Sequence, residues 1–295
     1  MKLSLIIPAR DKNDPKLAEL LRSIEAQDFP KNEMEVLVIT EGTSESAKTI
    51  GIRKAKGEVI GILASDNELI NNKFLSEAYF HAEADGSSQP LFYSYTPDDN
   101  LLNRYFSLVG CNDLLAMYMG KRDKAGWNSE GGVNLNFRQR TLGDNGFFIR
   151  RNLILKTDLD NYYHIDNAVE AVEDYPYLMT NSIWHKTGGN IFSFFRKRYR
   201  YGLQHAFNKN RRWHLVDFRQ PKDIVRLICF IVFTVTIIEP FILSVRGYLK
   251  IRDLAWLLHP VICLITLLTY SILIVHLAIN RMFQSLSAPM AVQKA

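Results

Sequence analysis

The longest apolar run of the chain places the strongest constraint on its fold. Residues 254–279 are 26 consecutive positions without a charged side chain. A helix rises 1.5 Å per residue, so this run is long enough to cross the roughly 30 Å hydrocarbon layer of a bilayer. We therefore expect a transmembrane helix over about residues 254–279, with a buried core helix as the alternative.

A second apolar run lies just before it. Residues 227–245 contain one charged side chain, Glu239, which is followed by Pro240. The Leu, Ile, Phe and Val residues of this run favour insertion by more than the roughly 3 kcal/mol that one acidic side chain costs. The run predicts another transmembrane helix, over about residues 225–246, and hence a hairpin of two spans. A buried helix or a re-entrant hairpin remains the alternative.

The basic residues gather in the same third of the chain. Residues 1–190 carry 21 Lys and Arg against 27 Asp and Glu, whereas residues 191–295 carry 15 against 4. A segment that is both basic and apolar favours the anionic surface of a membrane over a nucleic acid. We expect a membrane partner and no nucleic-acid partner.

Basic and aromatic residues alternate just before the apolar runs. Residues 196–212 contain seven basic side chains and no acidic one. A helix of this kind is suited to the lipid headgroup layer, and an ordinary solvated helix with an aromatic core stripe is the alternative. The predicted organisation is a globular domain over residues 1–190, an interfacial segment over residues 191–222, and two spans with a short cytosolic tail over residues 223–295.

The amino-terminal apolar stretch is too short for a signal peptide. It covers residues 3–8 and is followed at once by Arg10 and Asp11. We expect a multi-pass membrane protein whose large domain lies on the cytosolic face.

Strand and helix patterns alternate in the first 63 residues. Short apolar runs predict buried strands at residues 3–8, 36–39 and 59–63, and helical spacing predicts helices at residues 14–27 and 44–55. This order is typical of an α/β fold with a parallel sheet covered on both faces. Ligands of such sheets bind beyond the carboxyl ends of the strands. The residues expected there are Pro8, Ala9, Arg10 and Asp11, then Thr40, Glu41 and Gly42, and then residues 64–68.

Asp66 is the most informative of these strand-end residues. The sequence lacks the glycine-rich motifs that hold dinucleotides or phosphates after a strand, so a diphosphate needs another ligand. Asp66, followed by Asn67 and Glu68, offers hard oxygen ligands for Mg²⁺ or Mn²⁺, and these ions bridge nucleotide phosphates. A turn or a helix cap is the plain alternative.

Taken in order, these motifs resemble the family 2 glycosyltransferases, which have a Rossmann-like GT-A fold. The resemblance covers about residues 3–205, and Ala64 stands where the first acid of the family's DxD motif would be. The segments that carry it are residues 4–8, 36–42, 47–58, 62–67, 143–151, 164–166, 184–185 and 196–202.

The resemblance implies a role for each candidate residue. Asp66 with Mg²⁺ or Mn²⁺ would neutralise the diphosphate, and Glu68 could compensate for Ala64. His185 would complete the metal shell or touch the diphosphate, and Asp166 would be the general base of a single inverting displacement. The residues expected to face the nucleotide are Pro8, Ala9, Arg10, Glu41 and Lys48, and those expected to shape the acceptor loop are Arg150 and Arg151.

Each role has a plain alternative. Glu41 could cap the helix that begins near Ser44, and Lys48 could be solvated surface. His185 could be a hydrogen-bonded structural histidine, and the arginine pair a salt-bridged strand end. Glu173 and Asp174 compete with Asp166 for the role of base.

The segment over residues 98–124 stands where the family varies with the acceptor. Its apolar spacing predicts a helix that packs near the membrane or in the core. Asn112 and Asp113 are candidates for the acceptor pocket.

The resemblance implies an inverting transfer from a UDP-sugar or GDP-sugar to a lipid-linked acceptor, in glycan or cell-envelope biosynthesis. The acceptor would be a polyprenyl phosphate or a polyprenyl-linked saccharide. The alternative is a catalytically weakened nucleotide-binding scaffold at the membrane, because Ala64 is a change expected in a degraded site. A transporter built on the two helices is a third alternative.

Overall fold

The structure is a computed structural model of the chain. It describes residues 1–90, 93–119, 145–157, 159, 177–179, 181–186, 189–207 and 218–287.

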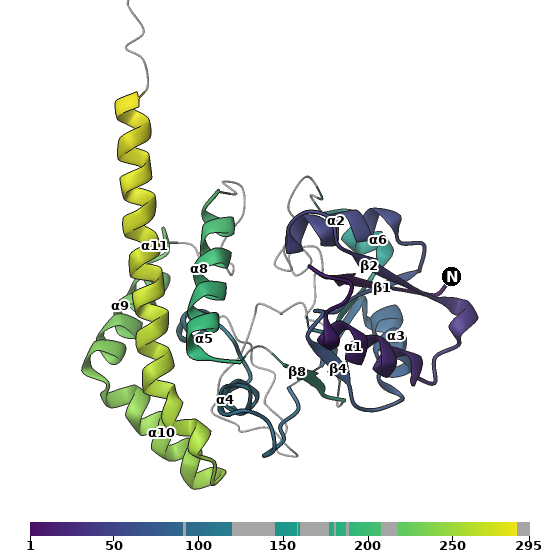
Figure 1. The fold of residues 1–295 in the computed structure, drawn as a ribbon, viewed down its shortest axis with the longest axis horizontal. Helices are drawn as coiled ribbons and strands as arrows, with labels where there is room; N and C mark the ends of the chain where they lie inside the picture. The colour runs from purple at the N-terminus through teal and green to yellow at the C-terminus, as the bar shows by residue number, and fades with distance from the viewer. Residues whose placement is uncertain are drawn as a thin grey trace, which may run out of the picture.

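A six-stranded sheet forms the centre of the amino-terminal part (Figure 1). β1 is parallel to β2 and β3, and β6 is antiparallel to both β3 and β5, so five strands share one direction. The predicted α/β class, a mostly parallel sheet between helices, is confirmed. The strands in spatial order are β2 (Met34–Ile39), β1 (Leu3–Pro8), β3 (Val59–Ile62), β6 (Phe147–Arg150), β5 (Ser87–Pro90) and β7 (Tyr177–Met179).

Helices cover both faces of this sheet because its strands are apolar on both sides. Successive side chains of a strand point to opposite faces. Leu5 therefore packs with Leu20 in one core, and Ile6 packs with Ile52 in the other. One face carries α1 (Pro15–Glu25) and α3 (Phe74–Asp85), and the other carries α2 (Ser44–Lys54) and α6 (Arg151–Ile154).

A second, two-stranded sheet lies just beyond the end of β3. β4 (Asn67–Leu69) pairs antiparallel with β8 (Ile183–His185). The register places Asn67 opposite His185, so the two segments that hold Asp66 and His185 are brought together.

The carboxyl-terminal part is helical, and the segment after residue 98 packs with it. Tyr105 and Phe106 share a core with Phe194 and Trp256, so core packing accounts for the apolar spacing of this segment as far as it is described. The helices are α4 (Leu101–Val109), α5 (Leu114–Tyr118), α8 (Ile191–Phe207), α9 (Pro221–Thr236), α10 (Ile238–Lys250), the 3-10 helix η3 (Leu254–Leu258) and α11 (His259–Ser287).

The expectation of two spanning helices is not supported. Among the described residues one helix is long and apolar enough to cross a membrane, over Leu254–Asn280. The first apolar run breaks at Ile237, whose φ of 62° is left-handed, and α9 and α10 meet there at 78°. A left-handed residue interrupts a right-handed helix, which apolar composition did not reveal.

The basic segment forms a helix that packs against α11, and its predicted place in the headgroup layer stays a prediction. α8 runs along α11, and Figure 1 shows it between α11 and the sheet. Gly202 lies so close to α11 that a Cβ atom there would be 2.4 Å from Cδ2 of Leu273. Part of the basic face of α8 is therefore turned toward the sheet.

Candidate functional site

Three neighbouring strands end together on one edge of the sheet. Pro8 at the end of β1 is opposite Ile39 at the end of β2, and Leu63 after β3 donates its N–H to Ile6 of β1. Arg10 and Glu41, which follow β1 and β2, are exposed, and Pro8 and Ala9 are half-buried. This is the edge where the sequence predicts a ligand.

A tight turn after β3 fixes the direction of Asp66. The N–H of Asn67 donates to the carbonyl of Ala64 at 3.0 Å, and the Oδ1 atom of Asn67 accepts from the N–H of Ala64 at 2.8 Å. Asp66 lies inside this turn and is 16% exposed at its side chain. The carboxylate is thus held by the backbone at the strand end.

His185 reaches Asp66 through the pairing of β4 with β8. Its Nε2 atom lies 3.3 Å from Oδ1 of Asp66, and its Nδ1 atom lies 2.8 Å from Nδ2 of Asn112. When the Asn112 amide donates to Nδ1, the proton of a neutral imidazole is on Nε2 and points to Asp66. The ring of Tyr93 lies 5.1 Å from that of His185, centroid to centroid.

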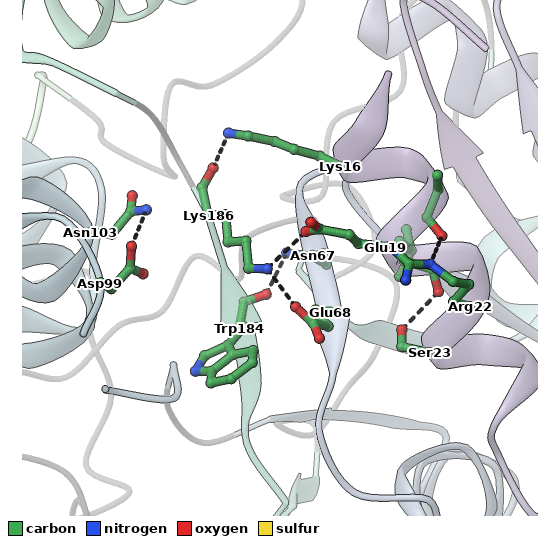
Figure 2. Close-up of polar contacts among 12 residues, drawn as sticks. Lys16, Glu19, Arg22, Ser23, Asn67, Glu68, Asp99, Asn103, Trp184 and Lys186 are labelled. Atoms are coloured by element: carbon green, nitrogen blue, oxygen red, sulfur yellow. Dashed lines mark hydrogen bonds and ion pairs between the residues drawn. The ribbon is translucent and has the colours of Figure 1, made fainter. Parts of the chain in front are cut away.

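Two lysines from distant elements add positive charge. Nζ of Lys197, on α8, lies 3.5 Å from Oδ2 of Asp66. Nζ of Lys16, at the start of α1, donates to the carbonyl of Lys186 at 2.6 Å (Figure 2). Desolvation alone raises the pKa of Asp66, but the charges of Lys197, His185 and Lys16 outweigh it and hold that pKa well below its ordinary value. Asp66 is therefore an anion in the acid range as well as at neutral pH.

Glu68 does not stand in for the acid that Ala64 replaces. Its carboxylate pairs with Nζ of Lys186 at 2.6 Å, and the same ammonium pairs with Glu19 at 2.8 Å (Figure 2). These ion pairs connect β4, β8 and α1, so Glu68 stabilises the arrangement of the elements beside the site.

Asn145 is a neighbour of the site that was not among the candidate residues, although it lies in the segment 143–151 that resembles the family pattern. Its Oδ1 atom accepts from Nδ2 of Asn67 at 3.0 Å, and its own amide donates to the hydroxyl of Tyr93 at 2.7 Å. Lys16, Tyr93 and Lys197 were likewise missed. For Lys197 a signal existed, because it belongs to the basic segment that resembles the family pattern.

The plain alternatives for Glu41 and Lys48 are both wrong. Thr43 caps α2 in a reciprocal capping box with Ser46, so Glu41 is not the cap. Lys48 is fully buried and forms an ion pair with Glu45 of the same helix, so it is not solvated surface. Because Lys48 is buried, the structure does not present it to a nucleotide at the strand ends.

The structure does not bring Arg150 and Arg151 to Asp66. Arg150 pairs with Val59 at the start of β3, which is the edge of the sheet opposite to Asp66. Arg151 donates from Nε to the carbonyl of Ala55 at 3.1 Å. The expected acceptor-loop role is thus not supported by their position. Asp166, Glu173 and Asp174 lie outside the described residues.

Asn112 and Asp113 are adjacent but face different groups. Asn112 contacts His185, whereas Oδ2 of Asp113 accepts from Nη1 of Arg198 at 3.0 Å and from the hydroxyl of Tyr270 at 2.6 Å. Asp113 thereby joins α5, α8 and α11. Asn112 is therefore a residue of the site, whereas Asp113 stabilises the packing of the helices beside it.

Asp66 and His185 fit a divalent cation as a pair of ligands. The 3.3 Å between Oδ1 and Nε2 lets both atoms approach one ion at about 2.1 Å. His185 can bind only when the Asn112 amide presents its oxygen to Nδ1 and leaves Nε2 unprotonated. No group of three or more His, Cys, Asp and Glu side chains gathers in the described ranges, so substrate oxygens and water would complete the shell.

No protein-family model matches the chain, and no curated protein sequence matches it. The chain is similar to several solved structures at low sequence identity. The mannosyltransferase PcManGT from Pyrobaculum calidifontis, in complex with GDP-Man and Mn²⁺, is 12% identical, with 92% of this chain and 86% of that chain covered and a TM-score of 0.48. TarS 1-349 from S. aureus, in complex with UDP, is 15% identical, with 83% and 75% covered and a TM-score of 0.44.

The structure of S. aureus TarS is 17% identical, with 72% of this chain covered and a TM-score of 0.39. This chain spans 41% of that TarS chain. Because these TM-scores are below 0.5, the chemistry of the site is inferred from the residues of this chain alone.

Proposed function

We propose that the chain is a membrane-associated inverting glycosyltransferase that moves a sugar from a nucleotide diphosphate to a lipid-linked acceptor. The observation that carries the proposal is the gathering of Asp66, His185, Lys197 and Lys16 beyond the carboxyl ends of β1, β2 and β3. This is the place where open α/β sheets bind nucleotides, and its charges suit a diphosphate.

In this proposal the donor lies along the strand ends. Its nucleoside rests against Pro8, Ala9, Arg10 and Glu41, and its diphosphate lies at Asp66. Asp66 and His185 would hold Mg²⁺ or Mn²⁺, which when bound supplies positive charge to the diphosphate oxygens.

The residues of the chain then stabilise the leaving group. As the bond between the sugar and the diphosphate breaks, negative charge grows on the diphosphate, and Lys197 can move from Asp66 to that charge. When no metal is bound, the N–H at Nε2 of His185 can donate to Asp66 and orient its carboxylate. Asp166 is proposed, from the family resemblance alone, as the base that takes the proton of a hydroxyl acceptor.

The acceptor is proposed to be a polyprenyl phosphate or a polyprenyl-linked saccharide. The support is the apolar helical part that lies next to the site, which places a lipid within reach. A site on the cytosolic face, and the division of the chain at residues 190 and 222, remain part of this proposal.

The test is transfer of labelled sugar by the full chain in membranes. UDP- and GDP-sugars are supplied in turn with Mn²⁺, and label is sought in the lipid extract. We expect one donor to label lipid, Asp66→Asn to abolish the label, and the exposed control Asp98→Asn to retain it. If Asp166→Asn abolishes sugar transfer but still binds the donor, a hydroxyl acceptor is favoured over a phosphate acceptor.

The weakened scaffold is the competing function, and Ala64 is the observation that favours it. Calorimetry with UDP and GDP, with and without Mn²⁺, separates the two. If the chain shows neither metal-dependent binding of UDP or GDP nor sugar transfer, the scaffold is supported and the proposed enzyme activity is overturned.

A further inference from the structure

The helical part carries a large apolar surface on the side away from the sheet. Of 30 large hydrophobic side chains that are exposed in the described residues, 22 belong to positions 224–282. We call this surface the outer face. Its exposed members are Ile224, Val225, Ile228, Ile231, Val232, Phe233, Val235, Ile237, Ile238, Phe241, Ile242, Val245, Leu249, Leu254, Leu257, Val261, Leu268, Ile272, Ile274, Val275, Ile279 and Met282.

Three polar side chains of α11 contact the rest of the protein. Tyr270 donates to Asp113 at 2.6 Å, and Nδ1 of His259 lies 2.8 Å from the hydroxyl of Tyr105. His276 contacts the hydroxyl of Tyr199 on α8. α11 is therefore apolar on its free side and polar on its protein side, although its composition is that of a spanning helix.

The site lies at the level of the middle of α11, not beyond its end. α8 runs beside α11 (Figure 1), with Gly202 against Leu273. The same helix carries Lys197, whose Nζ atom lies 3.5 Å from Oδ2 of Asp66. If α11 crossed a bilayer with its middle in the hydrocarbon, these charges would lie at hydrocarbon depth. That placement costs several kcal/mol for each charge.

The charges around the outer face are of one sign. In the described range 218–280 the exposed charged side chains are basic. Asp223 and Asp253 are buried, and Glu239 is half-buried and accepts from Tyr118 at 2.6 Å. Apolar side chains with basic neighbours complement a leaflet that contains anionic lipids. The exposed basic residues are Arg219, Lys222, Arg226, Arg246, Lys250 and Arg252.

We infer that the outer face docks on one leaflet of an anionic bilayer, with α11 lying along the membrane plane instead of crossing it. The inference rests on the membrane association in the proposed function, but not on sugar transfer. It places α11 at the leaflet, with α8 between α11 and the sheet that holds the site.

Depth measurements on spin-labelled full-length protein test the orientation. The labels are placed at Val261→Cys, Leu268→Cys, Val275→Cys and Met282→Cys in a Cys229→Ser background, since Cys111 and Cys263 are buried. Vesicles contain phosphatidylcholine and phosphatidylglycerol, and the control is Phe80→Cys, exposed on the sheet side.

We expect the four labels at similar shallow depths, about 5–10 Å below the headgroups, and the control label in water. A spanning helix would instead place Leu268 and Val275 deepest and the end labels at opposite surfaces. That depth profile would overturn the inference.

A charge placed on the outer face tests the docking itself. We expect Ile272→Glu to weaken vesicle binding by at least about tenfold and Phe80→Glu to leave it unchanged. If the outer face instead binds a second copy, the chain will dimerise without vesicles, Ile272→Glu will give monomers, and vesicle binding will be absent. Loss of sugar transfer with intact docking would overturn the proposed sugar transfer alone, and a spanning depth profile with intact sugar transfer would overturn this inference alone.

Discussion

The Nε2 atom of His185 lies 3.3 Å from Oδ1 of Asp66, and this contact depends on the pairing of two short strands. Asp66 follows a strand of the main sheet, whereas His185 ends β8, which pairs antiparallel with β4 in the second sheet. The chemistry of the site therefore depends on the β4–β8 sheet as much as on the main sheet.

Asn112 controls what His185 can do. Asn112→Asp would fix the imidazole proton on Nδ1 and leave Nε2 free to bind a metal. We expect a rise of about tenfold in Mn²⁺ affinity, measured by calorimetry on the full chain, and a shift of the His185 ring nitrogens in NMR spectra. Asn112→Leu is the control, and it should lower the affinity. Equal affinities in all three proteins would show that His185 is no ligand.

Lys197 is expected to contribute directly to diphosphate binding. Lys197→Met removes a cation that lies 3.5 Å from Asp66, and a hydrogen bond to a charged group is worth roughly 1.5–3 kcal/mol. We expect a loss of about tenfold to a hundredfold in affinity for UDP or GDP, measured by calorimetry. The matched control is Arg200→Met, exposed on the same helix. A similar loss of affinity in Arg200→Met would mean that the overall positive charge of α8 causes the effect, and not a contact of Lys197 with the diphosphate.

Asp113 is expected to affect stability and not donor binding. Asp113→Asn weakens its contacts with Arg198 and Tyr270 and leaves a half-buried guanidinium without its anion. We expect a loss of roughly 1–3 kcal/mol in the free energy of unfolding, seen as a lower Tm in detergent. Donor binding should stay within about twofold. A large loss of donor binding at unchanged Tm would place Asp113 in the site instead.

The sequence predicts the main sheet well because each strand carries its own local signal. The runs at residues 3–8 and 59–63 are apolar on both faces, and they form β1 and β3 as expected. The polar residues after them meet at one edge because parallel strands share their direction. Asp66 could therefore be selected from sequence alone.

The remainder of the site could not be predicted because its contacts are long-range and carry no local pattern. β8 is three residues long, so its own sequence carries no local pattern for pairing with β4, and His185 was expected near Asp66 from the family resemblance alone. The break at Ile237 is different, because the sequence holds a local signal for it. Pro240 has no N–H to donate to the carbonyl of Thr236 in a continuous helix, but the apolar composition of the run outweighed this proline in the prediction.

Tyr95 is expected to make stability depend on pH in the alkaline range. Its hydroxyl donates to Oδ2 of Asp253 at 2.5 Å, and desolvation together with this carboxylate raises its pKa from 10.0 to about 12. The contribution of Tyr95 to stability is therefore complete below pH 10 and is lost as pH rises through 12. We expect the Tm difference between the native chain and Tyr95→Phe to be largest below pH 10 and to shrink toward pH 12. A constant difference across this range would mean that the hydroxyl does not interact with Asp253.

Ala64 offers a gain-of-function test of the metal site. Ala64→Asp restores a carboxylate at the first position of the motif, inside the turn that already orients Asp66. Each added carboxylate strengthens binding of a hard cation, so we expect Mn²⁺ affinity to rise by about tenfold in the presence of UDP or GDP. Ala64→Asn is the matched control, because it adds a similar volume without charge. If Ala64→Asp leaves Mn²⁺ binding unchanged while donor binding persists, the diphosphate is held by Lys197 and Lys16, and the metal has no part in this site.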